Sequence, residues 1–345
     1  MVARRAFSGD SSVRLRGHYF PHEGIEFIPS GCTVLDCVLG GGWPLGRIAN
    51  IVGDKAVGKT LLAIEACANF AQKYPKGHIW YREAEAAFDV DYAGELGLPV
   101  ARVDFGPEGT DSSWDTVEDI AEDLEQCLVA AQKSGQPGIY IIDSLDALSS
   151  RAEMDRKAGE GTYGLEKPKQ LGQLFRKQVR AVKAARVSLL VVSQIRDKIG
   201  IMFGDKHTRT GGKALDFYAS QILWLHHKGI LKSVVRGTER TTGVRIRAKC
   251  KKNKMAPSFR ECEFVLRFGY GTDDFEAACA YLLEVGMLGR VQPGLKKEDL
   301  PKFLRQLYKL SGAELRAKQV SVAEIVRATW FEVEERFKPT QRKYG

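Results

Sequence analysis

The most constraining feature of this chain is the stretch 53–60, GDKAVGKT, which matches the pattern GxxxxGK(S/T). An apolar run, IANIV, precedes it, and LLAI follows it as the start of a helix. This order of strand, loop and helix is the context in which the pattern binds phosphate. Glycines let the backbone wrap around phosphate groups, and the N–H groups of the loop and helix terminus point at them. The stretch therefore predicts a nucleoside triphosphate site on an α/β fold.

The pattern also assigns roles within the site. Lys59 is expected to reach the β- and γ-phosphates, and the Thr60 hydroxyl to bind Mg²⁺. Asp143 ends the apolar run IYIID at 139–143, where a carboxylate would hold the same Mg²⁺ through water. The residues expected to surround the nucleotide are Gly53, Asp54, Lys55, Ala56, Val57, Gly58, Lys59, Thr60, Leu61 and Asp143.

Carboxylates also follow the apolar run HIWY at 78–81, as Glu83 and Glu85. A carboxylate at the end of that strand could act as the general base that polarises an attacking water. From spacing alone the two residues are equal candidates.

Short apolar runs at 48–52, 78–81, 139–143 and 189–194 are typical of strands that are buried on both faces. Helical patterns lie between them, including an amphipathic helix predicted over 112–130 with one apolar stripe and an acidic face. Alternating strands and helices predict a mostly parallel sheet sandwiched by helices.

The chain divides into three expected parts. Residues 1–30 form a polar arm that could serve in oligomerisation, 31–270 form the α/β core, and 271–345 form a small basic domain of helices at 274–288, 298–311 and 321–337. Within the core, 151–170 and 196–213 are long, polar, and rich in Gly and Lys/Arg. Long irregular loops inside a compact domain are usually functional or disordered.

Charge favours an anionic partner, since the net charge is +9. From Val244 the chain alternates, with Arg245, Arg247, Lys249 and Lys251 on one side. One interpretation is a solvated edge strand whose basic residues discourage aggregation. The other is a face that follows a phosphate backbone.

Several classes of protein are excluded because the sequence lacks their characteristic features. No apolar run approaches the roughly 18–20 residues that span a bilayer, and no apolar stretch follows the basic N-terminal residues as in a secretory signal. The 7 cysteines are scattered, without a CxxC pair, which excludes a zinc site or a disulfide framework and favours a reducing cytoplasm. We therefore expect no membrane contact.

The stretches SQIRDKIGIMFG at 193–204, TGGKAL at 210–215, FYAS at 217–220 and KNKMAP at 252–257 resemble the bacterial RecA family. The similarity runs from about residue 28 to 288. It implies a P-loop, RecA-like core plus a small C-terminal helical domain. It also implies a DNA-dependent ATPase that uses ATP and Mg²⁺, forms filaments with its own copies on single-stranded DNA, and pairs homologous strands. The alternative is a ring-forming RecA-fold motor, such as a helicase or a branch-migration protein.

The resemblance also implies residue roles. Glu85 becomes the catalytic glutamate, Gln194 the γ-phosphate sensor, and Lys252 and Lys254 reach ATP on a neighbouring subunit. The adenine contacts are Asp89 and Tyr92. Single-stranded DNA would be bound by Lys169, Arg176, Arg196, Lys198, Ile199, Thr208, Gly211 and Gly212. Arg247 and Lys249 would form a secondary site for duplex DNA.

Overall fold

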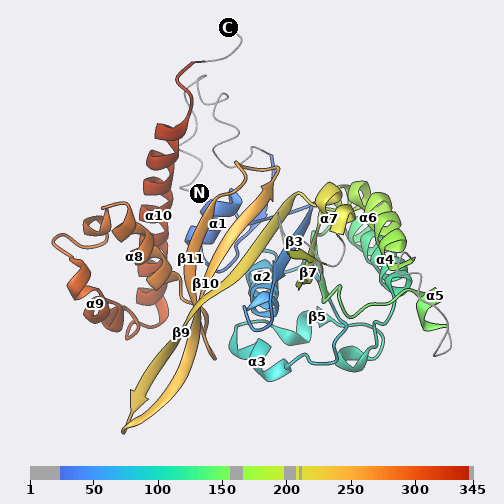
Figure 1. Ribbon diagram of the computed structural model, residues 1–345, viewed down its shortest axis with the longest axis horizontal. Helices are drawn as coiled ribbons and strands as arrows, with labels where there is room; N and C mark the ends of the chain where they lie inside the picture. Colours follow the sequence, from blue (N-terminus) through green and yellow to red (C-terminus); the bar gives the residue numbers. More distant parts are fainter. Residues whose placement is uncertain (1–23, 156–165, 198–206, 210–211, 342–345) are drawn as a thin grey trace.

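The computed structural model describes residues 24–155, 166–197, 207–209 and 212–341. Its main feature is a sheet of 10 strands in the order β12-β11-β10-β9-β3-β7-β6-β4-β5, with β8 paired to β7 (Figure 1). Pairs from β9 to β5 are parallel, whereas those from β9 to β12 and β7 with β8 are antiparallel. The predicted α/β fold with a mostly parallel centre is confirmed.

The strands are β1 Phe27–Ile28, β2 Trp43–Pro44, β3 Ile48–Gly53, β4 His78–Glu83, β5 Val103–Asp104, β6 Gly138–Asp143, β7 Val187–Asp197, β8 His207–Arg209, β9 Gln221–Val235, β10 Thr238–Asn253, β11 Glu261–Arg267 and β12 Gly271–Thr272. The helices are α1 Thr33–Leu39, α2 Lys59–Lys73, α3 Val90–Glu95, α4 Val117–Ser134, α5 Arg151–Met154, α6 Glu166–Ala184, α7 Gly212–Tyr218, α8 Asp274–Glu284, α9 Leu300–Leu307 and α10 Gly312–Phe337.

Helices cover both faces of the sheet because its central strands are apolar on both sides. Neighbouring residues of β6, Ile141 and Ile142, belong to two different buried clusters. The first cluster joins the sheet to α1, α2 and the C-terminal helices, and the second joins it to α4 and α6. All four predicted buried strands are present, as β3, β4, β6 and β7.

The helix predicted over 112–130 is wrong at both ends, because capping groups set the bounds of α4. The Thr116 side chain accepts a hydrogen bond from the Asp119 N–H at 3.2 Å, so the helix begins after it. Gly135 ends the helix with φ 67°. Trp114, which the pattern had put on the apolar stripe, therefore precedes the helix.

The long loops are shorter than expected. α5 and the start of α6 lie within 151–170, and the end of β7, all of β8 and the start of α7 lie within 196–213. The remaining parts, 156–165, 198–206 and 210–211, lie outside the described residues.

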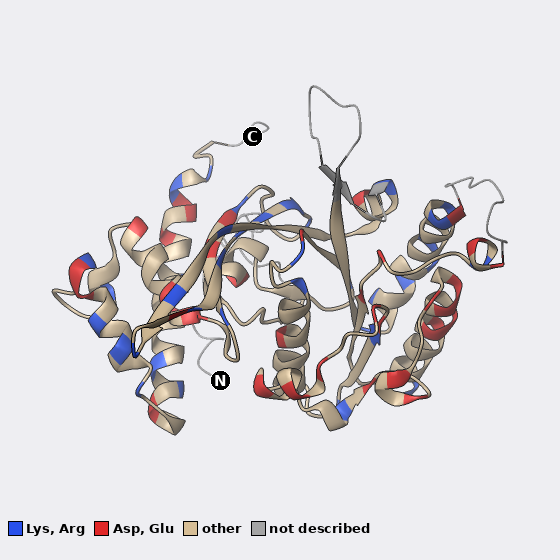
Figure 2. Ribbon diagram, turned by 60° about the horizontal axis from the view of Figure 1, so that its bottom comes forward, with Lys and Arg blue, Asp and Glu red and all other residues tan. Residues whose placement is uncertain are grey.

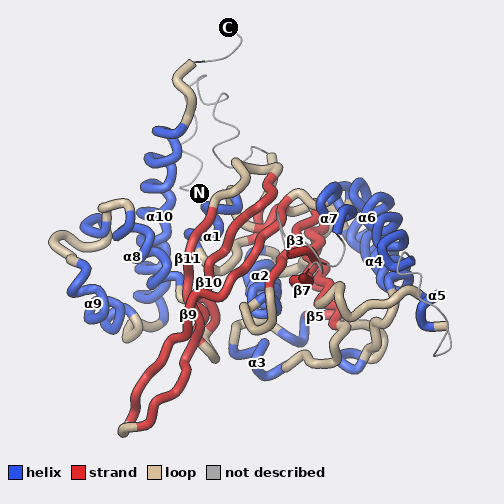
Figure 3. Tube along the Cα trace, viewed as in Figure 1, coloured by secondary structure: helices blue, strands red, loops and turns tan. Residues whose placement is uncertain are grey.

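The edge-strand interpretation of the basic stretch from Val244 is wrong, because β10 pairs with β9 on one side and β11 on the other. β9 and β10 continue beyond the sheet as a projecting two-stranded ribbon (Figure 3). In the C-terminal part all three helices have other bounds than predicted: α8 ends at Glu284, α9 spans Leu300–Leu307, and α10 is one long helix from Gly312.

The proposed division into arm, core and C-terminal domain stays a prediction. The end of the arm forms β1, which pairs with β2. Phe275 of α8 and Trp330 of α10 belong to the same buried cluster as the core residue Ile51. Basic and acidic residues are interspersed on the C-terminal helices (Figure 2). Among the described helices, none combines the length and the apolar character that crossing a bilayer requires.

A buried carboxylate ties the helix after the nucleotide loop to the edge of the sheet. Glu65 of α2 is 9% exposed and accepts hydrogen bonds from the N–H and the hydroxyl of Thr272 in β12. A Cβ on Gly271 would lie 2.4 Å from Glu65 Oε1, so glycine is needed for this approach. Burial raises the pKa of Glu65 to about 7.

We expect the Glu65→Gln variant to remove a pH dependence of stability. Because the folded-state pKa of about 7 exceeds the ordinary value of 4.5, the neutral carboxyl stabilises the fold at low pH, and this contribution is lost as pH rises through 7. From about pH 6 to about pH 8 the original protein should lose roughly 1 kcal/mol of unfolding free energy relative to the variant. Guanidinium unfolding at both pH values measures this, and an equal difference at both would contradict it.

Candidate nucleotide site and DNA-facing groove

The site residues lie together because neighbouring parallel strands end at one edge of the sheet. Gly53 at the end of β3 is in register with Gln194 of β7. Glu83 at the end of β4 is in register with Asp143 at the end of β6. The strands β3, β7, β4 and β6 thus place their C-terminal polar residues at the same edge of the sheet.

The loop between β3 and α2 has the conformation that a phosphate cradle requires. Ala56 and Gly58 have φ values of 56° and 82°, in the left-handed region. A Cβ on Gly58 would lie 2.0 Å from Leu266 Cδ1 of β11, so a side chain cannot be accommodated there. Lys59 Nζ donates to the Asp54 carbonyl oxygen at 2.6 Å, curled back over its own loop. Burial lowers the pKa of Lys59, while Asp143 and Glu85 oppose this shift.

Asp143 is buried, with 5% of its surface exposed. Tyr81 donates a hydrogen bond of 2.7 Å to its Oδ2. Burial raises the pKa of Asp143 to about 6, and hydrogen bonds from Tyr81 and Thr60 counteract the rise. The Thr60 hydroxyl and the Asp143 carboxylate therefore meet at the start of α2, as oxygen donors that suit Mg²⁺ with several waters retained. Among the described residues, no cluster of three or more His, Cys, Asp or Glu forms a metal site of another kind.

Glu85 and Gln194 are in direct contact. Gln194 Nε2 donates to Glu85 Oε1 at 3.2 Å, and the Ser144 hydroxyl donates to the same oxygen at 2.5 Å. The Gln194 backbone N–H donates to Asp146 Oδ2 at 2.6 Å. Glu85 is otherwise exposed, so its carboxylate can reach a water molecule.

Glu83 has a different environment, which separates two residues that spacing left equal. Its carboxylate accepts hydrogen bonds from the N–H groups of Glu85 at 2.8 Å and Ala87 at 3.2 Å. These bonds shape the loop that carries Glu85. The geometry thus favours Glu85 as the base and Glu83 as a positioning residue.

The predicted adenine contacts lie at the start of α3. The Asp89 carboxylate caps this helix by accepting from the Tyr92 N–H at 2.9 Å, and Tyr92 is half-buried. Sequence reasoning missed the β11–β12 turn beside them. Gly269 approaches Glu95 of α3, and the aromatic rings of Phe268 and Tyr270, 58% and 49% exposed, flank that glycine. The only sequence signal was a pair of aromatics around a glycine.

Lys252 and Lys254 lie away from the nucleotide loop of their own chain, beside α7. Both side chains donate to the carbonyl oxygen of Phe217, at 3.1 Å and 3.5 Å. The Phe217 ring is 71% exposed. An exposed aromatic next to two lysines suits a contact with another subunit.

Two of the predicted DNA-binding residues, Lys169 and Arg176, line one groove of about 560 Å³ between α6 and α7, together with Lys213. On the β7–β8 hairpin, the backbone of Arg196 is in register with that of Thr208. Gly212 begins α7.

Three predicted DNA contacts, Lys198, Ile199 and Gly211, lie outside the described residues.

Arg247 and Lys249, the predicted secondary site, lie next to each other on β10 and both contact Glu261 of β11. The Arg247 guanidinium donates to Glu261 Oε1, and Lys249 Nζ lies 3.4 Å from Oε2. Sequence alternation correctly placed both cations on one face but gave no sign of this partner.

A family model described as "RecA N-terminal domain" matches residues 3–273. Protein RecA of Nocardioides sp. is 35% identical over 291 residues, which cover 81% of this chain and 78% of that protein. The chain belongs to the RecA family. Protein RecA of Bifidobacterium longum is 36% identical over 311 residues, covering 87% and 74%. Protein RecA of Streptomyces avermitilis is 38% identical over 252 residues, covering 73% and 62%.

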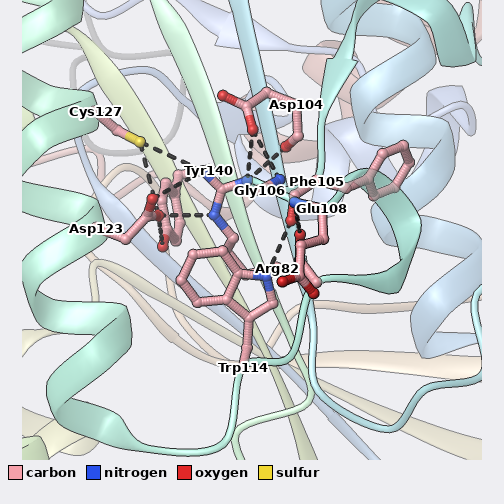
Figure 4. A network of polar contacts seen from close by, with 10 residues as sticks. Arg82, Asp104, Phe105, Gly106, Glu108, Trp114, Asp123, Cys127 and Tyr140 are labelled. Atoms are coloured by element: carbon pink, nitrogen blue, oxygen red, sulfur yellow. Dashed lines mark hydrogen bonds and ion pairs between the residues drawn. The ribbon is translucent and has the colours of Figure 1, made fainter.

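In this RecA-family chain a buried arginine supports the strand that leads to Glu83 and Glu85. Arg82 is 1% exposed, donates to both carboxylate oxygens of Asp123 in α4, and reaches the carbonyl of Asp104 at 2.6 Å (Figure 4). Its guanidinium also lies over the rings of Trp114 and Tyr140, at 4.7 Å and 5.5 Å.

These partners come from α4, β6 and the segment around β5. The network therefore holds these three elements around the end of β4. No pattern in the sequence had singled out Arg82.

We expect Glu85→Gln to lower ATP turnover about 100-fold or more, the range of a lost general base, with ATP affinity almost unchanged. Glu83→Gln should have a smaller effect, because one amide oxygen can still accept a loop N–H. Steady-state hydrolysis and equilibrium binding of a labelled nucleotide separate the two quantities. A larger loss of turnover in Glu83→Gln would reverse the two roles.

Proposed function

We propose that this RecA-family chain, a DNA-dependent ATPase of recombination and repair, binds ATP with Mg²⁺, forms filaments on single-stranded DNA and pairs it with homologous duplex. The contact that carries this proposal is the hydrogen bond of 3.2 Å between Gln194 and Glu85. It joins the residue proposed as the base to the strand β7, which continues into the loop proposed to bind DNA. The expected location is the cytoplasm, since the scattered free cysteines suit a reducing compartment.

In this mechanism the loop of residues 53–60 holds the phosphates with its N–H groups, and Lys59 leaves the Asp54 carbonyl to reach the β- and γ-phosphates. Thr60 would bind Mg²⁺, and Asp143 would hold it through water. Glu85 orients a water for attack on the γ-phosphate and accepts its proton. Charge on the phosphoryl group is stabilised by Lys59 and, from a neighbouring subunit, by Lys252 and Lys254.

Coupling to DNA follows from competition for the Gln194 amide. With a γ-phosphate present, the amide can donate to phosphate oxygen in place of Glu85. Gln194 lies four residues before residue 198, near the start of the loop proposed to bind DNA. A shift of its side chain would therefore act next to that loop. The bound nucleotide would thereby change the affinity for DNA.

Single-stranded DNA would enter the groove lined by Lys169, Arg176 and Lys213. Neither Arg176 nor Lys213 forms an ion pair with another residue in the described part of the chain, so both cations are available to phosphate. Phosphate contacts give affinity without sequence preference. Sequence is then read by base pairing between strands.

The alternative, a ring-forming RecA-fold motor, is less favoured because the family match covers residues 3–273. Electron microscopy with single-stranded DNA and a slowly hydrolysed ATP analogue distinguishes the two. Helical filaments support the proposal, whereas closed rings would support the motor.

We expect ATP hydrolysis to rise strongly with single-stranded DNA and to fall steeply with salt, because each neutralised phosphate contributes a slope of about −0.7 for single strands. Lys59→Ala should abolish hydrolysis with and without DNA, since Lys59 is the residue proposed to hold the β- and γ-phosphates. A coupled phosphate-release assay over a salt series measures both effects. Salt-insensitive hydrolysis that needs no DNA would contradict the proposal.

A further inference from the structure

The two DNA-binding surfaces of the proposed function differ in how their cations are paired. In the α6–α7 groove, Arg176 and Lys213 have no ion-pair partner among the described residues. On β10, by contrast, Arg245 pairs with Glu276 at 2.7 Å, and Arg247 and Lys249 share Glu261. The first surface keeps two cations without a carboxylate partner, although its third cation, Lys169, lies 3.9 Å from Glu166, whereas the cations of the second surface are all paired.

Strand register explains why Glu261 reaches both cations. In the β10–β11 pairing, Lys249 is directly opposite Glu261, and Arg247 is opposite Glu263. The side chains of Arg247, Lys249, Glu261 and Glu263 therefore share one face of the sheet. One oxygen of Glu261 takes the diagonal neighbour Arg247 and the other approaches the direct neighbour Lys249.

A phosphate could take the place of this carboxylate, because it too offers anionic oxygens, one to the Arg247 guanidinium and one to the Lys249 ammonium. The hydrogen bond from Arg247 lowers the pKa of Glu261, so it is ionised at neutral pH. The side chains of Arg247, Lys249 and Glu261 are 41%, 37% and 36% exposed, so DNA could reach them.

Exposed ion pairs of this kind are weak and screened by salt. A DNA strand that offers many phosphates can therefore displace Glu261, at some loss of affinity. A buried ion pair would differ, because DNA could not reach its cations to replace the carboxylate.

We propose that Glu261 sets the affinity of the second-strand site, by holding Arg247 and Lys249 until a DNA phosphate replaces it. The inference rests on the proposed secondary DNA site. Its consequence is that duplex binds this surface more weakly than it would bind the same two cations without Glu261.

The test is Glu261→Gln, which keeps the shape and removes the charge. Protein is first bound to unlabelled poly(dT) with a slowly hydrolysed ATP analogue, and capture of a fluorescein-labelled duplex is then measured over a salt series. Each additional phosphate neutralised steepens the salt slope by about 0.9, so the gain in capture of the variant over the original protein should be roughly 5- to 10-fold greater at about 0.1 M salt than at about 1 M. We expect a change of this size.

The matched control is Glu239→Gln on the projecting ribbon. It makes the same change in net charge on the neighbouring strand β10, but Glu239 pairs with Lys232 at 2.7 Å and does not contact Arg247 or Lys249. We expect duplex capture by this variant to equal that of the original protein. Equal gains in both variants would overturn the inference, because they would show an effect of net charge alone.

A second control is the Arg247→Gln, Lys249→Gln double variant, alone and combined with Glu261→Gln. If the double variant captures duplex normally, the proposed secondary site is wrong. If it captures duplex poorly while Glu261→Gln alone changes nothing, the site stands and the role of Glu261 is wrong. The inference predicts that Glu261→Gln has no effect in the double-variant background. Hydrolysis stimulated by poly(dT) checks that every variant folds.

Discussion

Parallel pairing of β3, β7, β6 and β4 is the constraint on which the proposed chemistry depends. It delivers the phosphate loop, Gln194, Asp143 and Glu85 to one edge of the sheet, although they are far apart in the chain. The pairing is stable because helices bury both faces of these strands. A loss of register by one residue would turn the polar ends into the core and the apolar residues out of it.

Polar groups inside the core reinforce this edge. Arg82 holds the end of β4 against α4 and β6, and Glu65 holds α2 against β12. Such groups are costly to bury unless every donor and acceptor is paired, and here they are paired by short hydrogen bonds. They lie directly behind the residues proposed to act on the nucleotide, where rigidity preserves distances of hydrogen-bond length. Their role in the fold is thus positional, since apolar side chains could fill the same volume.

The two proposed DNA surfaces differ in whether their cations are already neutralised by carboxylates. Sequence counts treat Arg176 and Arg247 alike, yet one has no carboxylate partner among the described residues and the other bonds to Glu261. Affinity for a polyanion depends on the cations that remain unneutralised. Two basic patches of similar composition can therefore differ in their affinity for DNA.

The sequence by itself determined the nucleotide loop, the four buried strands and the class of fold, because these depend on local pattern: glycines and lysine at fixed spacing, and continuous apolar runs. Local spacing could not choose between Glu83 and Glu85, locate the start of α4, or reveal that β10 lies inside the sheet. Those outcomes depend on partners distant in the chain, namely Gln194 and Ser144 for Glu85 and β9 and β11 for β10. Only the tertiary structure decides which side chains meet, since hydrogen bonds and ion pairs act over a few ångströms in space whatever the separation along the chain.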